Sequence, residues 1–354
     1  MRTPLPLLLL AGLLPAASAA PPATVTPGID FSHEDWTLAC DNTRTCRAAG
    51  YQRDDGDSEP VSILLTRLGG PDQPVTAELM LGQYDETTLP RQLRLQINDT
   101  ALGKLAYDAG AGTADFSAAQ VAALLASLSR SSRVVVVGDD GKRWTVSDRG
   151  ASAVLLKMDE FQGRLGTPGA LVRKGTRAEA SVLPALPVPV IVLGRTVATR
   201  PADQALADSP ALRAALVAAT SADECEALHP DGTMFGDEGP QAITVQRLSA
   251  DKLLVSQGCW RGAYNTGDGY WVVNDRPPYA PTLVTASAVD DELRTIQEAQ
   301  KGRGLGDCWY SASWGWTGTR FVKTAESRSG LCRLVAAGGA WEMPTVVTKV
   351  QEPH

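Results

Sequence analysis

The chain has 354 residues and a formal net charge of −7, with 44% hydrophobic and 21% charged residues. This length suffices for two domains, and the apolar content is that of a chain with packed cores. The acidic balance argues against a nucleic-acid partner, and no run of basic residues offsets it.

The first 19 residues have the three parts of a secretory signal peptide: Arg2, an apolar run from Leu7 to Leu14, and the cleavage pattern Ala17-Ser18-Ala19. The apolar run is much shorter than the roughly 20 residues that span a bilayer. We expect cleavage after Ala19 and a mature chain without a membrane span. The alternative is a buried N-terminal helix, which the three prolines among the first fifteen residues disfavour.

The mature chain is expected to have an α+β fold in two parts. Residues 20–173 form an N-terminal antiparallel β domain with two helices, and residues 174–208 form a Pro/Ala-rich linker. Residues 209–350 form a disulfide-containing, mainly antiparallel β domain. The apolar stretch from Val188 to Leu193 predicts that the linker packs in part against the domains.

In the first half, alternating or continuous apolar residues predict short strands, the first two of which flank a tight turn at Asp41-Asn42-Thr43. The predicted strands are Trp36 to Cys40, Thr45 to Tyr51, Val61 to Leu68, Ala77 to Leu81, Leu93 to Ile97, Val134 to Val137 and Arg143 to Val146.

Two helices complete the first half. Ser117 and Gln120 have the spacing of a capping box and predict a helix start. A second helix carries Val154, Met158, Phe161 and Leu165 on one face, and we expect Gly166 and Pro168 to end it.

The second half opens with a short helix, in which Ser209 is the expected N-cap and Pro210 takes the first helical position. Strands Lys252 to Arg261 and Tyr270 to Asn274 are predicted to flank a turn at residues 265–269. Trp314 and Trp316 alternate on a further strand, and Phe321 begins its return.

Six cysteines in an exported chain indicate paired disulfides. Six cysteines allow 15 pairings; proximity in the chain favours Cys40 with Cys46, Cys225 with Cys259, and Cys308 with Cys332. Each such bridge would contribute about 2 to 4 kcal/mol in the chain-entropy model. Zinc is the rival use of cysteine, but no C-x-x-C pair exists and histidines are scarce, so we expect no metal.

Five sequence blocks carry a resemblance to a known family. They are Trp36 to Ala48, Asp159 to Arg164 with Ala170 to Gly175, Trp271 to Asp275, Lys301 to Trp309, and Ala336 to Trp341. In this order they resemble a family of exported bacterial proteins catalogued as a domain of unknown function, family number 1176. The resemblance implies a periplasmic location and no particular activity. The first domain also resembles the invasion-associated locus B proteins through its Trp-to-Cys opening.

Familiar catalytic patterns are missing. The three histidines are His33, His229 and the C-terminal His354, and no Gly-x-Ser-x-Gly elbow accompanies them. The acidic run from Asp54 to Glu59 could bind calcium, but it lacks the EF-hand pattern and is more typical of a solvated turn. Gly302, Gly304 and Gly306 precede a strand and not a helix, which argues against a phosphate loop.

Polar residues lie among the aromatic residues of the second half and form our candidate binding site. The set is Trp260, Arg261, Tyr264, Asn265, Tyr270, Asn274, Asp275, Arg303, Asp307 and Trp309. Such a site could stack on a sugar or grip a peptide. The alternative is that the tryptophans fill a small core and the charged residues pair at its rim.

We therefore expect a non-enzymatic periplasmic binding or envelope-accessory protein with no cofactor, whose partner is an envelope glycan or another periplasmic protein. One alternative is a hydrolase of cell-envelope glycans that uses two carboxylates, drawn from Asp268, Asp275, Asp307 and Glu342. Another is an inhibitor or partner-binding module with an exposed hairpin tip. The sequence does not indicate an oligomeric state.

Overall fold

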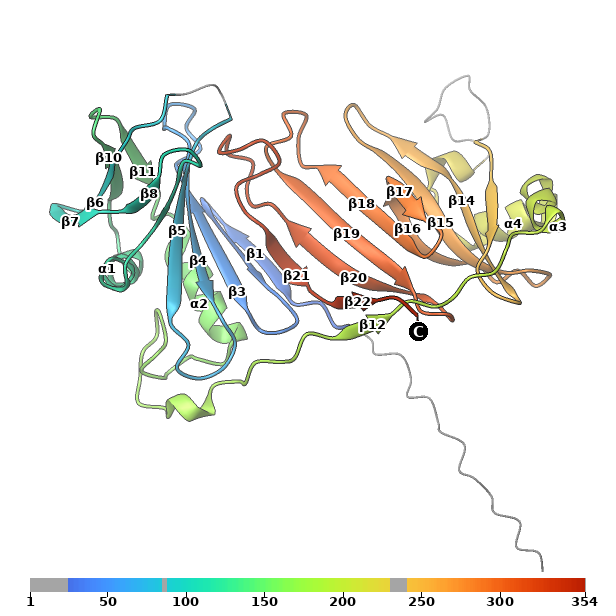
Figure 1. The fold of residues 1–354 in the computed structure, drawn as a ribbon, viewed down its shortest axis with the longest axis horizontal. Helices are drawn as coiled ribbons and strands as arrows, with labels where there is room; N and C mark the ends of the chain where they lie inside the picture. Colours follow the sequence, from blue (N-terminus) through green and yellow to red (C-terminus); the bar gives the residue numbers. More distant parts are fainter. Residues whose placement is uncertain (1–24, 85–87, 230–240, 354) are drawn as a thin grey trace, which may run out of the picture.

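The computed structural model describes residues 25–84, 88–229 and 241–353, and shows two β-rich halves side by side (Figure 1). The expected signal peptide and His354 lie outside the described residues. The described part is mostly antiparallel β structure with four α-helices, which confirms the predicted α+β class.

The first half contains two antiparallel sheets. The larger has the order β1 (Ile29–His33), β2 (Trp36–Cys40), β3 (Cys46–Tyr51), β4 (Val61–Arg67), β5 (Val75–Leu81), β9 (Thr113–Asp115) and β8 (Ala106–Asp108). The smaller has the order β11 (Arg143–Val146), β10 (Val134–Gly138), β6 (Leu93–Ile97) and β7 (Thr100–Lys104). All seven predicted strands are present, and β1, β7, β8 and β9 are additional.

Two helices pack on these sheets. Helix α1 (Ala118–Leu128) begins with the predicted capping box of Ser117 and Gln120. Helix α2 (Ala151–Phe161) ends at Phe161, earlier than predicted from Gly166 and Pro168. Gly163 follows the C-cap at φ 70°, the left-handed conformation that commonly ends a helix, and the polar side chains on either side of it turn inward.

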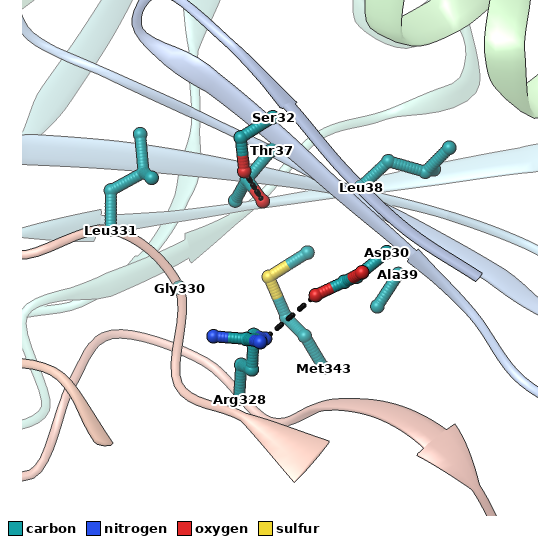
Figure 2. Close-up of a pocket in the computed structure, with 9 residues that line it drawn as sticks. All are labelled: Asp30, Ser32, Thr37, Leu38, Ala39, Arg328, Gly330, Leu331 and Met343. Carbon is teal, nitrogen blue, oxygen red and sulfur yellow. Dashed lines mark hydrogen bonds and ion pairs between the residues drawn. The ribbon is translucent and has the colours of Figure 1, made fainter. Parts of the chain in front are cut away.

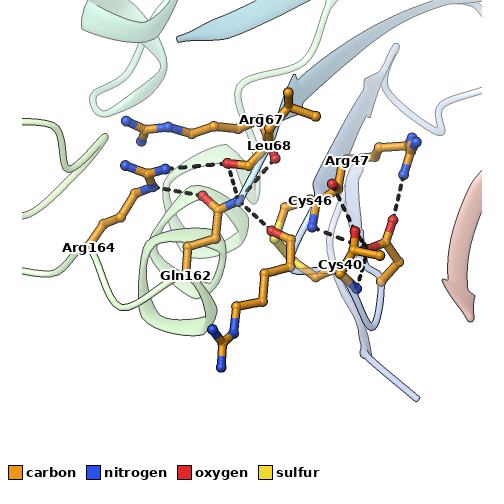
Figure 3. Close-up of a disulfide and its surroundings, with 11 residues drawn as sticks. Cys40, Cys46, Arg47, Arg67, Leu68, Gln162 and Arg164 are labelled. Atoms are coloured by element: carbon orange, nitrogen blue, oxygen red, sulfur yellow. Dashed lines mark hydrogen bonds and ion pairs between the residues drawn. A yellow bond between two sulfur atoms is a disulfide. The ribbon is translucent and has the colours of Figure 1, made fainter. Parts of the chain in front are cut away.

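Those inward side chains are Gln162 and Arg164, both fully buried. The Gln162 amide nitrogen contacts the carbonyl oxygens of Arg44, Arg67 and Leu68 at 2.9, 3.0 and 3.2 Å, and its oxygen accepts from Arg164 at 2.9 Å (Figure 3). One amide therefore ties two hairpin turns to the end of α2, beside the disulfide of Cys40 and Cys46. Buried polar groups need such complete pairing because an unpaired one is costly.

The second half consists of helices α3 (Pro201–Gln204) and α4 (Pro210–Ala219) and two further antiparallel sheets. One sheet has the order β13 (Thr244–Arg247), β14 (Lys252–Arg261), β15 (Thr266–Asn274) and β16 (Thr282–Ala288). The other has the order β17 (Asp290–Glu292), β18 (Thr295–Lys301), β19 (Trp309–Trp316), β20 (Phe321–Arg328) and β21 (Met343–Val346). Ser209 caps α4 as predicted, by accepting from the amide of Leu212.

The disulfides join Cys40 to Cys46, Cys225 to Cys259 and Cys308 to Cys332, as predicted from proximity in the chain. The turn predicted at residues 265–269 is wrong, because β15 already begins at Thr266. Its glycines allow close packing: a Cβ on Gly267 would lie 2.3 Å from the Trp260 ring, and one on Gly269 would lie 2.2 Å from the Trp271 ring. Glycine within a strand commonly marks such a close approach.

The chain between the halves is extended. Its strand β12 (Val190–Val192) pairs in parallel with β22 (Lys349–Gln351) near the C-terminus. Ile191 and Leu193 are buried, whereas Val190 and Val192 are exposed. The predicted linker therefore has residues that pack and residues that face solvent.

A clamp, defined as residues 329–343, crosses from the second half onto the larger sheet of the first. Its Leu331, Val335, Ala340, Trp341 and Met343 pack against Ala39, Ala49, Tyr51 and Leu64. Opposite this face, the larger sheet meets the main core of the first half. Strand β2 is consequently buried at all five positions, because both of its faces are covered.

Polar contacts fix the clamp. Arg333 donates to the Asp35 carboxylate at 3.0 Å, and these side chains are only 10% and 5% exposed. The Tyr51 hydroxyl accepts from the amide of Leu331, and the Trp341 indole donates to the hydroxyl of Ser62 at 2.7 Å. Burial raises the pKa of Tyr51, which keeps the phenol neutral at this contact.

Replacing Arg333 by Gln should lower the free energy of unfolding by about 3 kcal/mol, because it leaves the buried Asp35 carboxylate without its cation. The exposed Arg149–Glu34 pair provides the control, and Arg149→Gln should cost less than about 1 kcal/mol. Urea unfolding of both variants measures the difference. Equal losses would show that the clamp ion pair is not a stabilising contact.

Candidate functional site

The ten candidate residues lie along β15 and its neighbours and do not form one cluster. Asn265 precedes β15 and Asp275 follows it, and a nine-residue strand separates its two ends by roughly 30 Å. Their side chains therefore belong to two different ends of the second half.

At one end, the tip of the β14–β15 hairpin meets the loop before β19. Asn265 exchanges two hydrogen bonds with the backbone of Lys301, at 2.9 and 3.0 Å. Arg303 forms a bidentate pair with the buried Asp307, which also accepts from the amide of Leu334 in the clamp. Tyr264 is 47% exposed beside this loop.

The remaining residues at this end are held by the protein itself. The Trp260 indole donates to Ala286, and the Trp309 indole donates to Gly306. Arg261 is exposed at the end of β14. Burial raises the pKa of Asp307, but the hydrogen bonds from Arg303 and Leu334 outweigh it and hold the pKa below its usual value.

At the other end, Asn274 accepts from Lys252 at 2.6 Å, and Asp275 accepts from Arg247 at 3.3 Å. Arg247 also forms a buried pair with Asp203 of α3, with hydrogen bonds of 2.7 and 2.5 Å. This pair fastens α3 to the sheet. Between the two ends, the buried Tyr270 donates to Asp291 at 2.6 Å.

The other sequence candidates are also scattered. His33 is exposed at the end of β1, and His229 contacts the carbonyl of Thr220. In the acidic run, Asp55 accepts from the amides of Asp57 and Ser58, which closes a turn on itself. One cluster of metal-ligand residue types occurs in the described chain, Asp307 with Cys308 and Cys332, but its cysteines form a disulfide.

The carboxylates proposed for glycan hydrolysis do not converge either. Asp275 and Asp307 are paired with Arg247 and Arg303, and Glu342 is exposed in the clamp. Asp268 lies in β15, where burial and the charge of Asp291 raise its pKa.

A groove that the sequence did not reveal lies where the two halves meet. Two cavities of about 220 and 150 Å³ share Asp30 of β1 and Arg328 of β20 among their lining residues. Figure 2 shows the cavity of about 220 Å³. We call this the junction groove; its lining comprises Pro27, Gly28, Asp30, Ser32, Thr37, Leu38, Ala39, Tyr310, Glu326, Arg328, Gly330, Leu331, Met343 and Thr345.

The groove has a charged centre and a mixed wall. Asp30 and Arg328 form an ion pair of 2.8 Å, and their side chains are 50% and 56% exposed. The hydroxyls of Ser32 and Thr37 lie 2.8 Å apart on one wall, with Leu331 and Met343 opposite (Figure 2). A concave site with apolar walls and few polar groups is typical of small-ligand binding, and such sites favour boundaries between domains.

A row of side chains continues from the groove across β20, β19 and β18. Arg328 lies opposite Tyr310, and Glu326 and Glu298 both lie opposite Ala312. The Arg328 guanidinium is 5.4 Å from the centre of the Tyr310 ring. Opposite residues of antiparallel strands share a face, so the small side chain of Ala312 lies between two glutamates.

The two glutamates differ in environment. Burial raises the pKa of Glu298, and the charge of Glu326 adds to this. Burial acts in the same direction on Glu326, but hydrogen bonds from Lys323, Tyr310 and Thr345 hold its pKa below the usual value. Burial and the hydrogen bond to Glu326 raise the pKa of Tyr310, so this phenol is neutral.

The Asp203–Arg247 pair predicts acid sensitivity of the second half. Hydrogen bonds from Arg247 lower the pKa of Asp203 from 3.8 to about 2. A carboxyl group whose pKa is lowered by folding stabilises the fold at pH values above its unfolded-state pKa. This contribution disappears as the pH falls through its folded-state pKa. We expect about 2 kcal/mol to be lost between about pH 4 and pH 2.

The measurement is chemical unfolding at several pH values in this window. Asp203→Asn should be less stable at neutral pH and should show a shallower pH dependence, because its side chain does not titrate. Equal pH slopes for the variant and the parent would contradict the assignment.

Comparison with known proteins gives three results. A family described as "Protein of unknown function (DUF1176)" matches residues 30–348, which confirms the resemblance carried by the five sequence blocks. An uncharacterised protein of Escherichia coli (strain K12), YpfG, is 26% identical over 331 residues, covering 87% of this chain and 90% of the relative. The crystal structure of invasion associated protein b from Bartonella henselae covers 38% of this chain and 99% of that chain, with 16% identity and a TM-score of 0.27.

Two further observations concern location. The three disulfides indicate an oxidising, extracytoplasmic compartment. Among the described residues, no helix has both the length and the apolar character needed to cross a bilayer.

Proposed function

This chain belongs to the DUF1176 family, and we propose that it is a non-enzymatic binding protein of the bacterial periplasm that holds a small polar ligand in the junction groove. The supporting observation is the half-exposed Asp30–Arg328 pair between the two cavities. The pair presents both charges to solvent beside hydroxyls and an apolar wall. A ligand with hydroxyl, carboxylate or amine groups matches this lining.

Binding is favoured over catalysis by the way the strongest polar groups are used. One oxygen of Glu326 accepts from Tyr310 and Lys323, and the other accepts from Thr345. A carboxylate occupied on both oxygens is held in place and is poorly available as a base. Glu326 instead positions the Tyr310 ring against the Arg328 guanidinium.

The ligand class we favour is a fragment of an envelope glycan, because sugar hydroxyls hydrogen-bond to charged side chains and to hydroxyls such as those that line the groove. Titration calorimetry with peptidoglycan disaccharide-peptides is the direct test. The double variant Asp30→Asn with Arg328→Gln should weaken binding at least tenfold. The double variant Asp99→Asn with Arg133→Gln changes an exposed ion pair elsewhere and should leave binding unchanged.

Unchanged binding by the groove variant, or equal loss in both variants, would contradict the groove as the site. Circular dichroism should show that both variants are folded, because an exposed ion pair contributes less than about 1 kcal/mol.

The rival function is a hydrolase of envelope glycans. It is favoured by Glu298 and Glu326, which flank Ala312 and whose pKa values move in opposite directions, the arrangement that separates acid from base. Their backbones are two strand spacings apart, roughly 10 Å, and inverting glycosidases need about 6.5 to 9.5 Å between carboxyl groups.

Incubation with purified peptidoglycan separates the two functions. We expect no more reducing sugar from the native protein than from Glu298→Gln, with the exposed Glu78→Gln as the control. Release by the native and control proteins that disappears in Glu298→Gln would establish the hydrolase and overturn the binding role.

A further inference from the structure

The chain between the halves, residues 173–200, forms an exposed strap along one side of the molecule (Figure 1). The described residues include eleven large hydrophobic side chains that are exposed, and six of them lie on the strap. These six are Leu183, Leu186, Val188, Val190, Val192 and Val197. Exposed apolar groups scattered singly are ordinary, but a contiguous series marks an interaction surface.

The strap holds these side chains outward by its backbone geometry. Val188, Val190 and Val192 alternate with the buried Ile191 and Leu193 along an extended chain. Side chains at alternate positions of a strand share a face, so the three valines point away from the protein together.

Both halves fix the strap in place. In the first half, Gly70 donates to the carbonyl of Leu183, and Leu186 donates to that of Thr43. In the second half, Gly194 donates to the carbonyl of Trp316. Its prolines at 184, 187 and 189 further restrict the backbone. The apolar stripe is therefore preformed.

The strap is also basic. It contains five arginines and lysines and one acidic residue, whereas the whole chain carries a net charge of −7. The one acidic side chain, Glu179, is paired with the buried Arg164 at 2.9 Å. Arg173 and Lys174 are exposed at the start of the strap. Over distances beyond the Debye length of about 8 Å, salt screens the acidic remainder of the protein.

We propose that the strap is a docking surface for an anionic phospholipid bilayer and holds the protein peripherally on a membrane of the envelope. Outward apolar side chains enter the interface between headgroups and acyl chains, and the basic residues of the strap attract the anionic headgroups. A second copy of the chain is a poorer occupant, because a symmetric contact would place one basic strap against another.

The test is co-sedimentation of the full mature chain with lipid vesicles. Vesicles that contain phosphatidylglycerol should bind the protein, and pure phosphatidylcholine vesicles should not. Raising the salt to about 0.5 M should weaken binding. The proposal is independent of the junction groove, so Asp30→Asn with Arg328→Gln should bind vesicles normally.

Matched variants separate the contribution of the apolar side chains to vesicle binding from that of the basic side chains. Val190→Ser with Val192→Ser should lower vesicle binding at least tenfold, whereas Val289→Ser with Leu305→Ser, exposed elsewhere, should not. Arg173→Gln with Lys174→Gln should lower binding about thirtyfold, because two basic residues at about 1 kcal/mol each contribute about 2 kcal/mol. The exposed Arg91→Gln with Arg94→Gln serves as its control.

All substituted side chains are exposed, so each variant should keep the melting temperature of the parent protein. This measurement checks that each variant is folded. Equal binding to both kinds of vesicle, no binding, or equal loss in strap and control variants would overturn the proposal. The proposal would also be overturned if the parent protein did not bind vesicles but instead self-associated or captured an acidic protein, and Val190→Ser with Val192→Ser abolished that association.

Discussion

The contact on which the rest of the structure depends is the clamp across the larger sheet of the first half. Strands β2, β3 and β4 carry apolar side chains on both faces, so the sheet needs a cover on each side. One cover comes from the first half itself, and the other comes from residues 329–343 of the second half. The disulfide between Cys308 and Cys332 fixes the start of the clamp to β19.

Features whose interacting residues lie close together in the sequence were predictable, and features that join distant residues were not. One capping box, one N-cap serine, apolar periodicity and nearby cysteines predicted the main helices, most strands and all three disulfides, because their partners lie within a few dozen residues. Glycines were misleading at 265–269, since Gly267 and Gly269 make room for tryptophan rings. The junction groove was not predictable, because Asp30 and Arg328 meet across almost the entire chain, and neither stands in a recognisable motif. The ten candidate residues are scattered for the converse reason. Residues near in sequence, such as Asn265 and Asp275, lie at opposite ends of one long strand.

Both proposed surfaces result from the way the halves are joined. The junction groove exists because β1 and the end of β20 approach each other beside the clamp. The strap is exposed because it crosses outside both halves, and β22 pairs with it near the C-terminus. Ligand binding in the groove and peripheral attachment through the strap would together describe an envelope protein that holds its ligand close to a membrane.

The clamp couples the two halves of the molecule. Hydrogen–deuterium exchange of the double variant Cys308→Ala with Cys332→Ala tests it most directly, because the substitution releases the clamp without touching the first half. We expect faster exchange both in residues 329–343 and in strands β2 to β4, since an uncovered sheet opens more readily. Faster exchange in the clamp alone, with β2 to β4 unchanged, would contradict it.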